Sequence, residues 1–196
     1  MEEEALIISE HIRRKHSPLV MESVCAHTLR FSLIASSAFI SDYRLTHSDS
    51  KEINQPSILF RVQMDEIFLH ELDAKRIRAH GVVFRGKDFI HMLILVANNL
   101  EIPIKLYDRS DIRYSLLVKT GKTWYERFGF EYEEKVPEEI REMCRSSNVS
   151  KMGDKDCLTA EVVRCALGSD HRFEALERIL CGKMVYKPSI KNRSKP

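Results

Sequence analysis

The chain has 196 residues, of which 43% are hydrophobic and 31% charged, and this suits one globular domain with at most a small addition. Its net charge of +2 is too small to indicate a nucleic-acid-binding protein, and no apolar run approaches the roughly 18 residues of a membrane-spanning helix. Five cysteines without a C-x-x-C pair argue against a disulfide framework or a thiolate zinc site. The acidic start M-E-E-E-A-L differs from a signal peptide. We expect an intracellular, cytoplasmic protein with reduced thiols, with the nucleus as the alternative compartment.

The first third of the chain contains one clear element. Residues 3–15 place Leu6, Ile7 and Ile12 among charges, which predicts a short amphipathic helix. Residues 19–45 are compatible with either strands or a helix, since their periodicity favours neither. Residues 46–56 are polar and predict a loop.

From residue 57 onward the patterns alternate between strand and helix. Strands are predicted at 57–63 and 67–74, and a buried helix at 88–99, which is apolar nearly all round. A basic loop with two glycines precedes that helix. The later elements are a strand at 101–107, a helical segment around 112–127 that Gly129 ends, and a strand at 130–136. This order predicts a mixed α/β fold with a parallel step across the 88–99 helix.

The character of the chain changes after Pro137. Proline at a first-turn position with acidic residues behind it is typical of a helix start. Two further helices are predicted, at 156–167 and at 169–181 with Ser169 as a candidate cap. Residues 137–196 are therefore expected to form a helical C-terminal extension that packs on the sheet, with a frayed basic tail from about residue 187.

The stretch T-G-K-T at 120–123 looks like the end of a phosphate-binding P-loop. That loop needs a glycine five residues before the Gly-Lys pair, so that backbone amides can surround the phosphates. Leu116 occupies this position, and no glycine lies between it and Gly121. The sequence therefore argues against a nucleotide loop here.

Four motifs occur in a suggestive order: E-L-D-A at 71–74, R-A-H-G-V-V at 78–83, E-I-P-I-K-L-Y at 101–107 and W-Y-E-R-F-G-F at 124–130. With the buried helix between the second and third, this order resembles the GNAT superfamily of acyl-CoA-dependent N-acyltransferases. The resemblance is best over residues 57–136. It implies a GNAT-like acyltransferase domain at 1–136 with a mixed, mostly antiparallel sheet flanked by helices. It also implies acetyl-CoA as co-substrate.

The resemblance places CoA at the glycine-containing loop, where the amides of a helix start would meet the pyrophosphate. Two registers fit. The first, which we favour, is Arg78-x-x-Gly81-x-Val83, with a valine where the family has a small residue and with Gly86 just inside the helix. The second uses Arg85 and Gly86 and leaves the helix shorter. The candidate cofactor-binding residues are Arg78, Gly81, Val82, Val83, Arg85 and Gly86.

Two residues are candidates for catalysis. Tyr125 matches the tyrosine of the family, where a phenol donates a proton to the departing CoA thiolate. Its alternative role is packing beside Trp124 and Phe128. Glu71 could accept a proton from the amine, a role that requires a buried carboxylate, or it could be a sheet-face charge paired with a lysine or arginine. His70 and His80 flank this region, and strand alternation predicts that His70 points away from the side of Glu71.

Three functions remain open on the sequence. The first is an N-acetyltransferase that moves an acetyl group from acetyl-CoA to a small-molecule or protein amine by direct attack. The second is a catalytically inactive GNAT-fold binding or scaffold protein, which Val83 favours. The third is an RNA-associated protein that uses the basic cluster of Lys75, Arg76, Arg78, Arg85 and Lys87, disfavoured because no aromatic stacking pattern accompanies the charges. No metal is expected, since the histidines lack ligand spacing, and no membrane partner.

Overall fold

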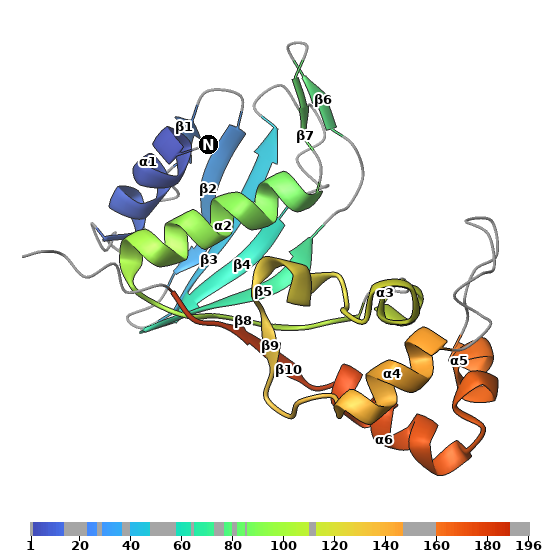
Figure 1. The fold of residues 1–196 in the computed structure, drawn as a ribbon. Coiled ribbons are helices and arrows are strands. Elements are labelled where there is room, and N and C mark those ends of the chain that lie inside the picture. Colours follow the sequence, from blue (N-terminus) through green and yellow to red (C-terminus); the bar gives the residue numbers. More distant parts are fainter. Residues whose placement is uncertain are drawn as a thin grey trace, which may run out of the picture. The chain divides into compact units, whose positions relative to one another are not determined.

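The computed structural model in Figure 1 describes eleven stretches of the chain, which are residues 2–13, 23–26, 29–36, 40–47, 58–63, 65–72, 77–79, 82–84, 86–109, 113–146 and 160–188. The polar 48–57 segment and the basic tail beyond residue 188 lie outside them. By their internal contacts the residues divide into two units. The first is Met1–Leu106 with Tyr186–Pro196, and the second is Tyr107–Val185.

The first unit is built on a six-stranded sheet in the order β1-β2-β3-β4-β5-β8. All neighbouring pairs are antiparallel except β5 and β8, which are parallel. The fold class expected from the sequence, a mixed and mostly antiparallel sheet with helices, is therefore confirmed. The strands are β1 (Ser23–Ala26), β2 (Leu29–Ser36), β3 (Ile40–His47), β4 (Ile58–Gln63), β5 (Glu66–Leu72) and β8 (Ile104–Tyr107).

Within the ambiguous stretch at 19–45, the described residues form three successive antiparallel strands of this sheet. A strand needs a neighbour to satisfy its backbone groups, and that neighbour is a tertiary feature which local periodicity does not contain. β4 and β5 alternate as predicted up to Leu69, where a register shift in their pairing puts Leu59 opposite Glu71 and Ile58 opposite Leu72, so that the predicted alternation does not continue. This alternation buries Ile58 and Phe60 on β4 and Ile67 and Leu69 on β5.

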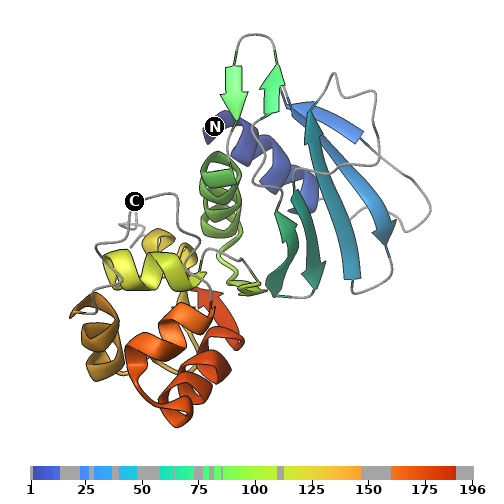
Figure 2. The same cartoon turned by 90° about the vertical axis from the view of Figure 1, so that its right-hand side faces the viewer.

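Two helices, α1 (Glu2–Arg13) and α2 (Gly86–Leu100), pack together and lie on one face of the sheet (Figures 1 and 2). α1 turns Ala5, Ile8 and Ile12 inward at the spacing of one helical face. The two helices are also joined by polar groups. The Asn99 side-chain amide donates to the Ser9 hydroxyl over 3.3 Å, and that hydroxyl donates to the Ala5 carbonyl over 2.6 Å. α2 buries Gly86, Phe89, Ile90, Met92, Leu93, Val96 and Ala97.

The segment before α2 differs from the expected basic loop. It contains an antiparallel pair of short strands, β6 (Ile77–Ala79) and β7 (Val82–Phe84), with Ala79 opposite Val82 and Arg78 opposite Val83. The physical reason lies in composition. Ile77, Val82, Val83 and Phe84 are β-branched or aromatic, and only two residues separate the strands, which is the commonest hairpin spacing.

The second unit is mainly helical. Its helices α3 to α6 pack against one another, and their buried residues include Leu117, Cys144, Val163, Phe173 and Leu176. A short ribbon completes it, with Tyr132 opposite Met184. The elements are α3 (Arg113–Thr120), the 3-10 turn η1 (Tyr125–Phe128), β9 (Glu131–Tyr132), α4 (Glu138–Ser146), α5 (Ala160–Leu167), α6 (Asp170–Leu180) and β10 (Lys183–Tyr186).

Three details of this unit depart from the sequence analysis. The boundary between the units falls after Leu106 rather than after residue 136, because α3 packs with α4 and α5. The helix expected at 112–127 is broken between Thr120 and Tyr125. A strand, β10, follows α6 where only helix and tail were expected. The helices after Pro137 are confirmed, and no described helix is long and apolar enough to cross a membrane.

Candidate functional site

The T-G-K-T stretch lies at the end of a helix, not at the start of one. Gly121 has a φ of 72°, in the left-handed region, and its N–H donates to the Leu117 carbonyl over 2.7 Å. This is how a glycine terminates a helix. A phosphate loop presents free amides at a helix N-terminus, whereas the end of α3 presents carbonyls. The structure therefore agrees with the sequence argument against a nucleotide loop.

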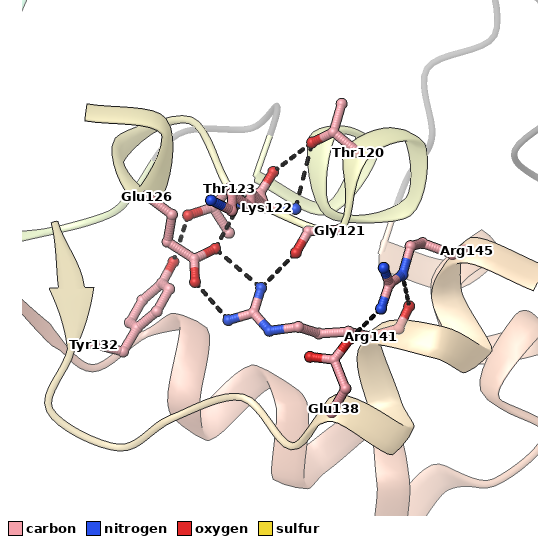
Figure 3. A network of polar contacts seen from close by, with 9 residues as sticks. All are labelled: Thr120, Gly121, Lys122, Thr123, Glu126, Tyr132, Glu138, Arg141 and Arg145. Atoms are coloured by element: carbon pink, nitrogen blue, oxygen red, sulfur yellow. Dashed lines mark hydrogen bonds and ion pairs between the residues drawn. The ribbon is translucent and has the colours of Figure 1, made fainter. Parts of the chain in front are cut away.

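A part-buried ion pair holds the turn that follows, as Figure 3 shows. Arg141 on α4 donates to Oε1 of Glu126 over 2.5 Å and to the Gly121 carbonyl over 2.5 Å. The other Glu126 oxygen, Oε2, accepts from the Thr123 backbone N–H over 2.7 Å. The side chains of Arg141 and Glu126 are only 14% and 12% exposed. Arg141 and Glu126, which we call the Arg141 clamp, thus hold both ends of the segment 121–126, which leads into η1.

Thr123 and Glu126 explain why the turn forms at this place. They stand three residues apart in the Thr-x-x-Glu pattern of a capping box, in which the glutamate accepts from the backbone N–H of the first residue. The Thr123 hydroxyl, in turn, accepts from the Tyr132 hydroxyl over 3.4 Å. Gly129, with a φ of 87°, ends η1 as the sequence predicts.

Tyr125 is the first residue of η1 and is half-buried among aromatic rings. Its ring centroid lies 4.8 Å from that of Trp124 and 5.7 Å from that of Phe130. Burial, and then the negative charge of Asp108, raise the pKa of the Tyr125 phenol above its usual value of 10. The phenol therefore keeps its proton at neutral pH. It is a good hydrogen-bond donor, but complete proton transfer to a thiolate, whose conjugate acid has a pKa near ~8.5, is uphill.

The carboxylate that acts on Tyr125 also lines a hollow of about 350 Å³, which we call the Asp108 hollow. Its lining residues are Tyr107, Asp108, Arg109 and Cys181. Asp108 is 1% exposed, whereas 45% of Tyr107 is exposed. The hollow thus combines a buried carboxylate, a guanidinium, a phenol and a thiol, and Tyr125 lies within electrostatic reach of it.

The sequence analysis missed this hollow. One signal was available, because Asp108 and Arg109 follow directly after a strand that is parallel to its neighbour, where ligand-binding residues commonly gather. Cys181 lies far along the chain, at the C-terminal end of α6. Its place beside Asp108 depends on how the second unit folds.

The first unit holds the other candidate residues, near the carboxyl end of β5. The parallel pairing of β5 with β8 covers three residue pairs and ends at Leu69 opposite Leu106, while β5 continues to Leu72. α2 must run back along the sheet to reach the start of β8, so its N-terminus at Gly86 lies at the carboxyl end of β5 (Figure 1). The positive end of a helix dipole and the carboxyl ends of two parallel strands therefore occur together.

The predicted cofactor residues are distributed unevenly around that end. Arg78 and Val83 are cross-strand partners in the β6–β7 hairpin, Val82 lies beside Val83, and Gly86 is the first residue of α2. Gly81 and Arg85 lie outside the described residues, as does His80. Of the described candidates, Arg78, Val82 and Val83 therefore belong to the hairpin, and Gly86 lies at the helix start.

The two residues with proposed proton-transfer roles belong to different units. Glu71 is exposed on β5, so the burial that a base role requires is absent. His70 stacks on Phe68, with ring centroids 4.9 Å apart. Desolvation lowers the His70 pKa, the nearby Arg61 lowers it further, and Asp42 opposes both. Phe68 and His70 share one face of β5 while Ile67 and Leu69 are buried on the other, as strand alternation predicts.

Within the described ranges, no group of three or more His, Cys, Asp or Glu side chains gathers as a set of metal ligands. No protein-family model, curated protein or solved structure matches this chain. The GNAT resemblance of the motifs is therefore carried by the residues themselves and remains a prediction.

Proposed function

We propose that the protein is an N-acetyltransferase of the GNAT type, which transfers an acetyl group from acetyl-CoA to an amine. One observation carries this proposal most directly. The parallel strands β5 and β8 stop pairing at Leu69 and Leu106, at the end of the sheet where α2 begins. Ligands of α/β folds bind outside the carboxyl ends of parallel strands, and phosphates favour a helix N-terminus.

The residues present at this helix start suit a pyrophosphate in part. Gly86 itself is buried, whereas exposed Lys87 adds a positive charge in the first turn. Asp88, also in the first turn, stabilises the helix but opposes an anionic ligand. Binding would therefore rest on the amides and on Lys87 more than on a preformed basic cradle.

The chemistry expected of such an enzyme is direct attack. The neutral amine attacks the thioester carbonyl, the carbon–nitrogen bond forms, and the carbon–sulfur bond breaks. We assign Tyr125 the role of a hydrogen-bond donor to the departing thiolate, because its raised pKa disfavours complete proton transfer. Glu71 is exposed, so we assign it proton acceptance through water rather than by direct contact.

One observation favours a second function. The β6–β7 hairpin occupies the residues that the favoured register assigns to the pyrophosphate loop, and it pairs Arg78 with Val83 across the strands. The hydrogen bonds between the two strands occupy backbone amides that would otherwise be able to bind a phosphate. This favours the alternative, a catalytically inactive GNAT-fold binding or scaffold protein.

A thermal-shift titration with acetyl-CoA tests the proposal. A ligand that binds only the folded state stabilises it by about 2.7 kcal/mol at roughly a hundredfold excess over its Kd. We expect a dose-dependent rise in Tm that is weakened in Lys87→Glu. A glutamate in the first turn favours the helix dipole, so a weaker response in this variant would not reflect a destabilised helix.

Lys122→Glu is the matched control, because it makes the same charge change at an exposed residue of the T-G-K-T turn. It should leave the acetyl-CoA response unchanged. Absence of any shift up to millimolar acetyl-CoA would reject the acetyltransferase and support the scaffold function. A loss in Lys122→Glu alone would move the anion site to the T-G-K-T turn.

A further inference from the structure

An irregularity in strand β5 changes which side chains share a face near its carboxyl end. Phe60 of β4 lies opposite Leu69, but the preceding residue of β4, Leu59, lies opposite Glu71, so His70 is an extra residue in β5. This arrangement is a β-bulge, a feature that re-aims side chains and is common beside active sites. Because directly opposite residues share a face, Glu71 lies on the side of Leu59, away from buried Phe60.

The bulge therefore brings His70 and Glu71 to one face of the sheet. His70 stacks on Phe68, on the side turned away from buried Ile67 and Leu69, and Glu71 lies on that side too. Uninterrupted strand alternation predicted His70 and Glu71 on opposite sides, and that prediction is wrong because of the extra residue. The helices α1 and α2 cover the other face (Figure 2).

His70 also stands where the parallel strands stop pairing. The pairing of β5 with β8 ends at Leu69 opposite Leu106, so His70 is the first residue of β5 beyond it. The proposed function places acetyl-CoA at this end of the sheet, beside the start of α2. A thioester held there would have CoA on the face of α2, and an amine that attacks from the other face would meet His70. All of these residues belong to the first unit.

The surroundings of His70 keep its imidazole neutral. Desolvation lowers the pKa of His70 below its ordinary value of 6.5, the positive charge of Arg61 lowers it further, and Asp42 opposes both. Arg61 on β4 is held beside Asp42 on β3 by an ion pair of 2.7 Å. On the other side, Lys105 of β8 is paired with Glu66. An exposed and neutral imidazole is able to accept a proton at neutral pH.

We propose that His70 is a catalytic residue that accepts the proton of the attacking amine, and that Glu71 passes this proton to solvent through water. The role rests on the proposed acetyl transfer. The nitrogen lone pair forms the carbon–nitrogen bond, the carbon–sulfur bond breaks with its electron pair on sulfur, and the amine proton moves to the imidazole. The thiolate takes one proton from solvent and His70 returns one to solvent, so atoms and charge balance.

The first test asks whether acetyl-CoA reaches His70. Diethyl pyrocarbonate modifies accessible neutral imidazoles, and peptide mass spectrometry of the full chain gives the modification rate of each histidine. We expect acetyl-CoA to slow modification of His70 about tenfold at roughly ten times its Kd, since only the free fraction reacts. His171, which is exposed on α6, should react at an unchanged rate.

The second test measures hydrolysis of acetyl-CoA, in which water replaces the amine and gives its proton to the same base. General base catalysis contributes about 10²–10⁴-fold, so we expect His70→Gln to lower the rate at neutral pH by roughly a hundredfold or more. His171→Gln is the matched control, because it makes the same change at another exposed histidine, and it should leave the rate unchanged. The Tm of each variant and its rise with acetyl-CoA should match those of the unmodified protein.

The pH dependence of hydrolysis separates a base from a structural role. In the unmodified protein the rate should fall about tenfold per pH unit below the pKa of His70, and His70→Gln should lack this fall. Arg61→Gln should move the fall to higher pH, because it removes the positive charge that lowers the His70 pKa while the charge of Asp42 remains.

The outcomes distinguish this role from the proposed function. Acetyl-CoA binding without selective protection of His70 would overturn its place at the thioester. Equal pH dependence in His70→Gln and the unmodified protein, including no hydrolysis by either, would overturn the base while leaving acetyl-CoA binding intact. Absence of acetyl-CoA binding in the thermal titration would instead reject the proposed function, and the role of His70 with it.

Discussion

The two units satisfy their backbone groups in different ways. In the first unit, the sheet ladders and two helices pair most backbone donors and acceptors regularly, and side chains such as Phe89 and Leu93 need only fill the core. In the second unit, the irregular segment between α3 and α4 depends on side chains. Arg141 binds the Gly121 carbonyl, and Glu126 binds the Thr123 N–H. In the second unit, charged side chains with little solvent contact therefore bind backbone groups that regular secondary structure leaves unpaired.

The largest effect is expected in the apolar core of the first unit. Phe89 on α2 is among its largest fully buried side chains, and truncation of a buried phenylalanine costs about 3–5 kcal/mol. We expect Phe89→Ala to lower the free energy of unfolding by that amount and to speed hydrogen exchange in β4 and β5. Urea unfolding and hydrogen-exchange mass spectrometry measure the two effects. A cost below ~1 kcal/mol would contradict the apolar basis of this unit's stability.

A somewhat smaller effect is expected from breaking the clamp of the second unit. Arg141→Ala leaves the Glu126 carboxylate, 12% exposed, without its guanidinium. We expect a loss of about 2–3 kcal/mol, less than the ~3–5 kcal/mol of a fully buried pair, because both side chains keep some solvent contact. Hydrogen exchange should rise at residues 121–128 in particular.

The double variant Glu126→Gln/Arg141→Met separates charge from packing. It removes both charges and keeps an amide oxygen that can accept from Thr123. If the cost of Arg141→Ala arises from an uncompensated buried charge, the double variant should recover most of the lost stability. Equal destabilisation by the single and double variants would show that the hydrogen bond to the Gly121 carbonyl matters more than the ion pair.

The smallest effect concerns Tyr125 and appears only at alkaline pH. Its folded-state pKa is raised above the ordinary value of 10, so the folded state holds the proton more tightly than the unfolded state. This contribution is fully present below pH 10 and is lost as the pH rises from that value through the folded-state pKa. We expect Tyr125→Phe to flatten the loss of stability above pH 10.

Unfolding free energies between neutral and strongly alkaline pH test this, with Tyr107→Phe as control. Tyr107, which is 45% exposed, provides the same tyrosine-to-phenylalanine change at a more open position. Equal slopes for Tyr125→Phe and the unmodified protein would mean that the phenol is solvated. Proton transfer from it to the thiolate would then be less uphill, which would strengthen its role as an acid in the proposed reaction.

Much of the fold was readable from the sequence where local pattern and tertiary role agree. The alternation at 58–69, the apolar α2 and the helices after Pro137 each record which face is buried, although Ser169 makes no side-chain cap hydrogen bond to α6. The hairpin at 77–84 shows where this reasoning failed, because the two glycines and the basic residues suggested a loop while the β-branched residues formed strands. The candidate site was only partly readable. Tyr125 was found from a motif, but Asp108 and Cys181 were not.

By itself, the sequence determined the fold class, the parallel step across α2 and the failure of the T-G-K-T stretch as a phosphate loop. These depend on periodicity, on glycine placement and on short-range spacing, all of which are local. Only the tertiary structure decided that the described residues of the 19–45 stretch are strands, that Glu71 is exposed, and that Cys181 and Asp108 line one hollow. Strand pairing, burial and the meeting of distant residues depend on neighbours that the folded chain supplies.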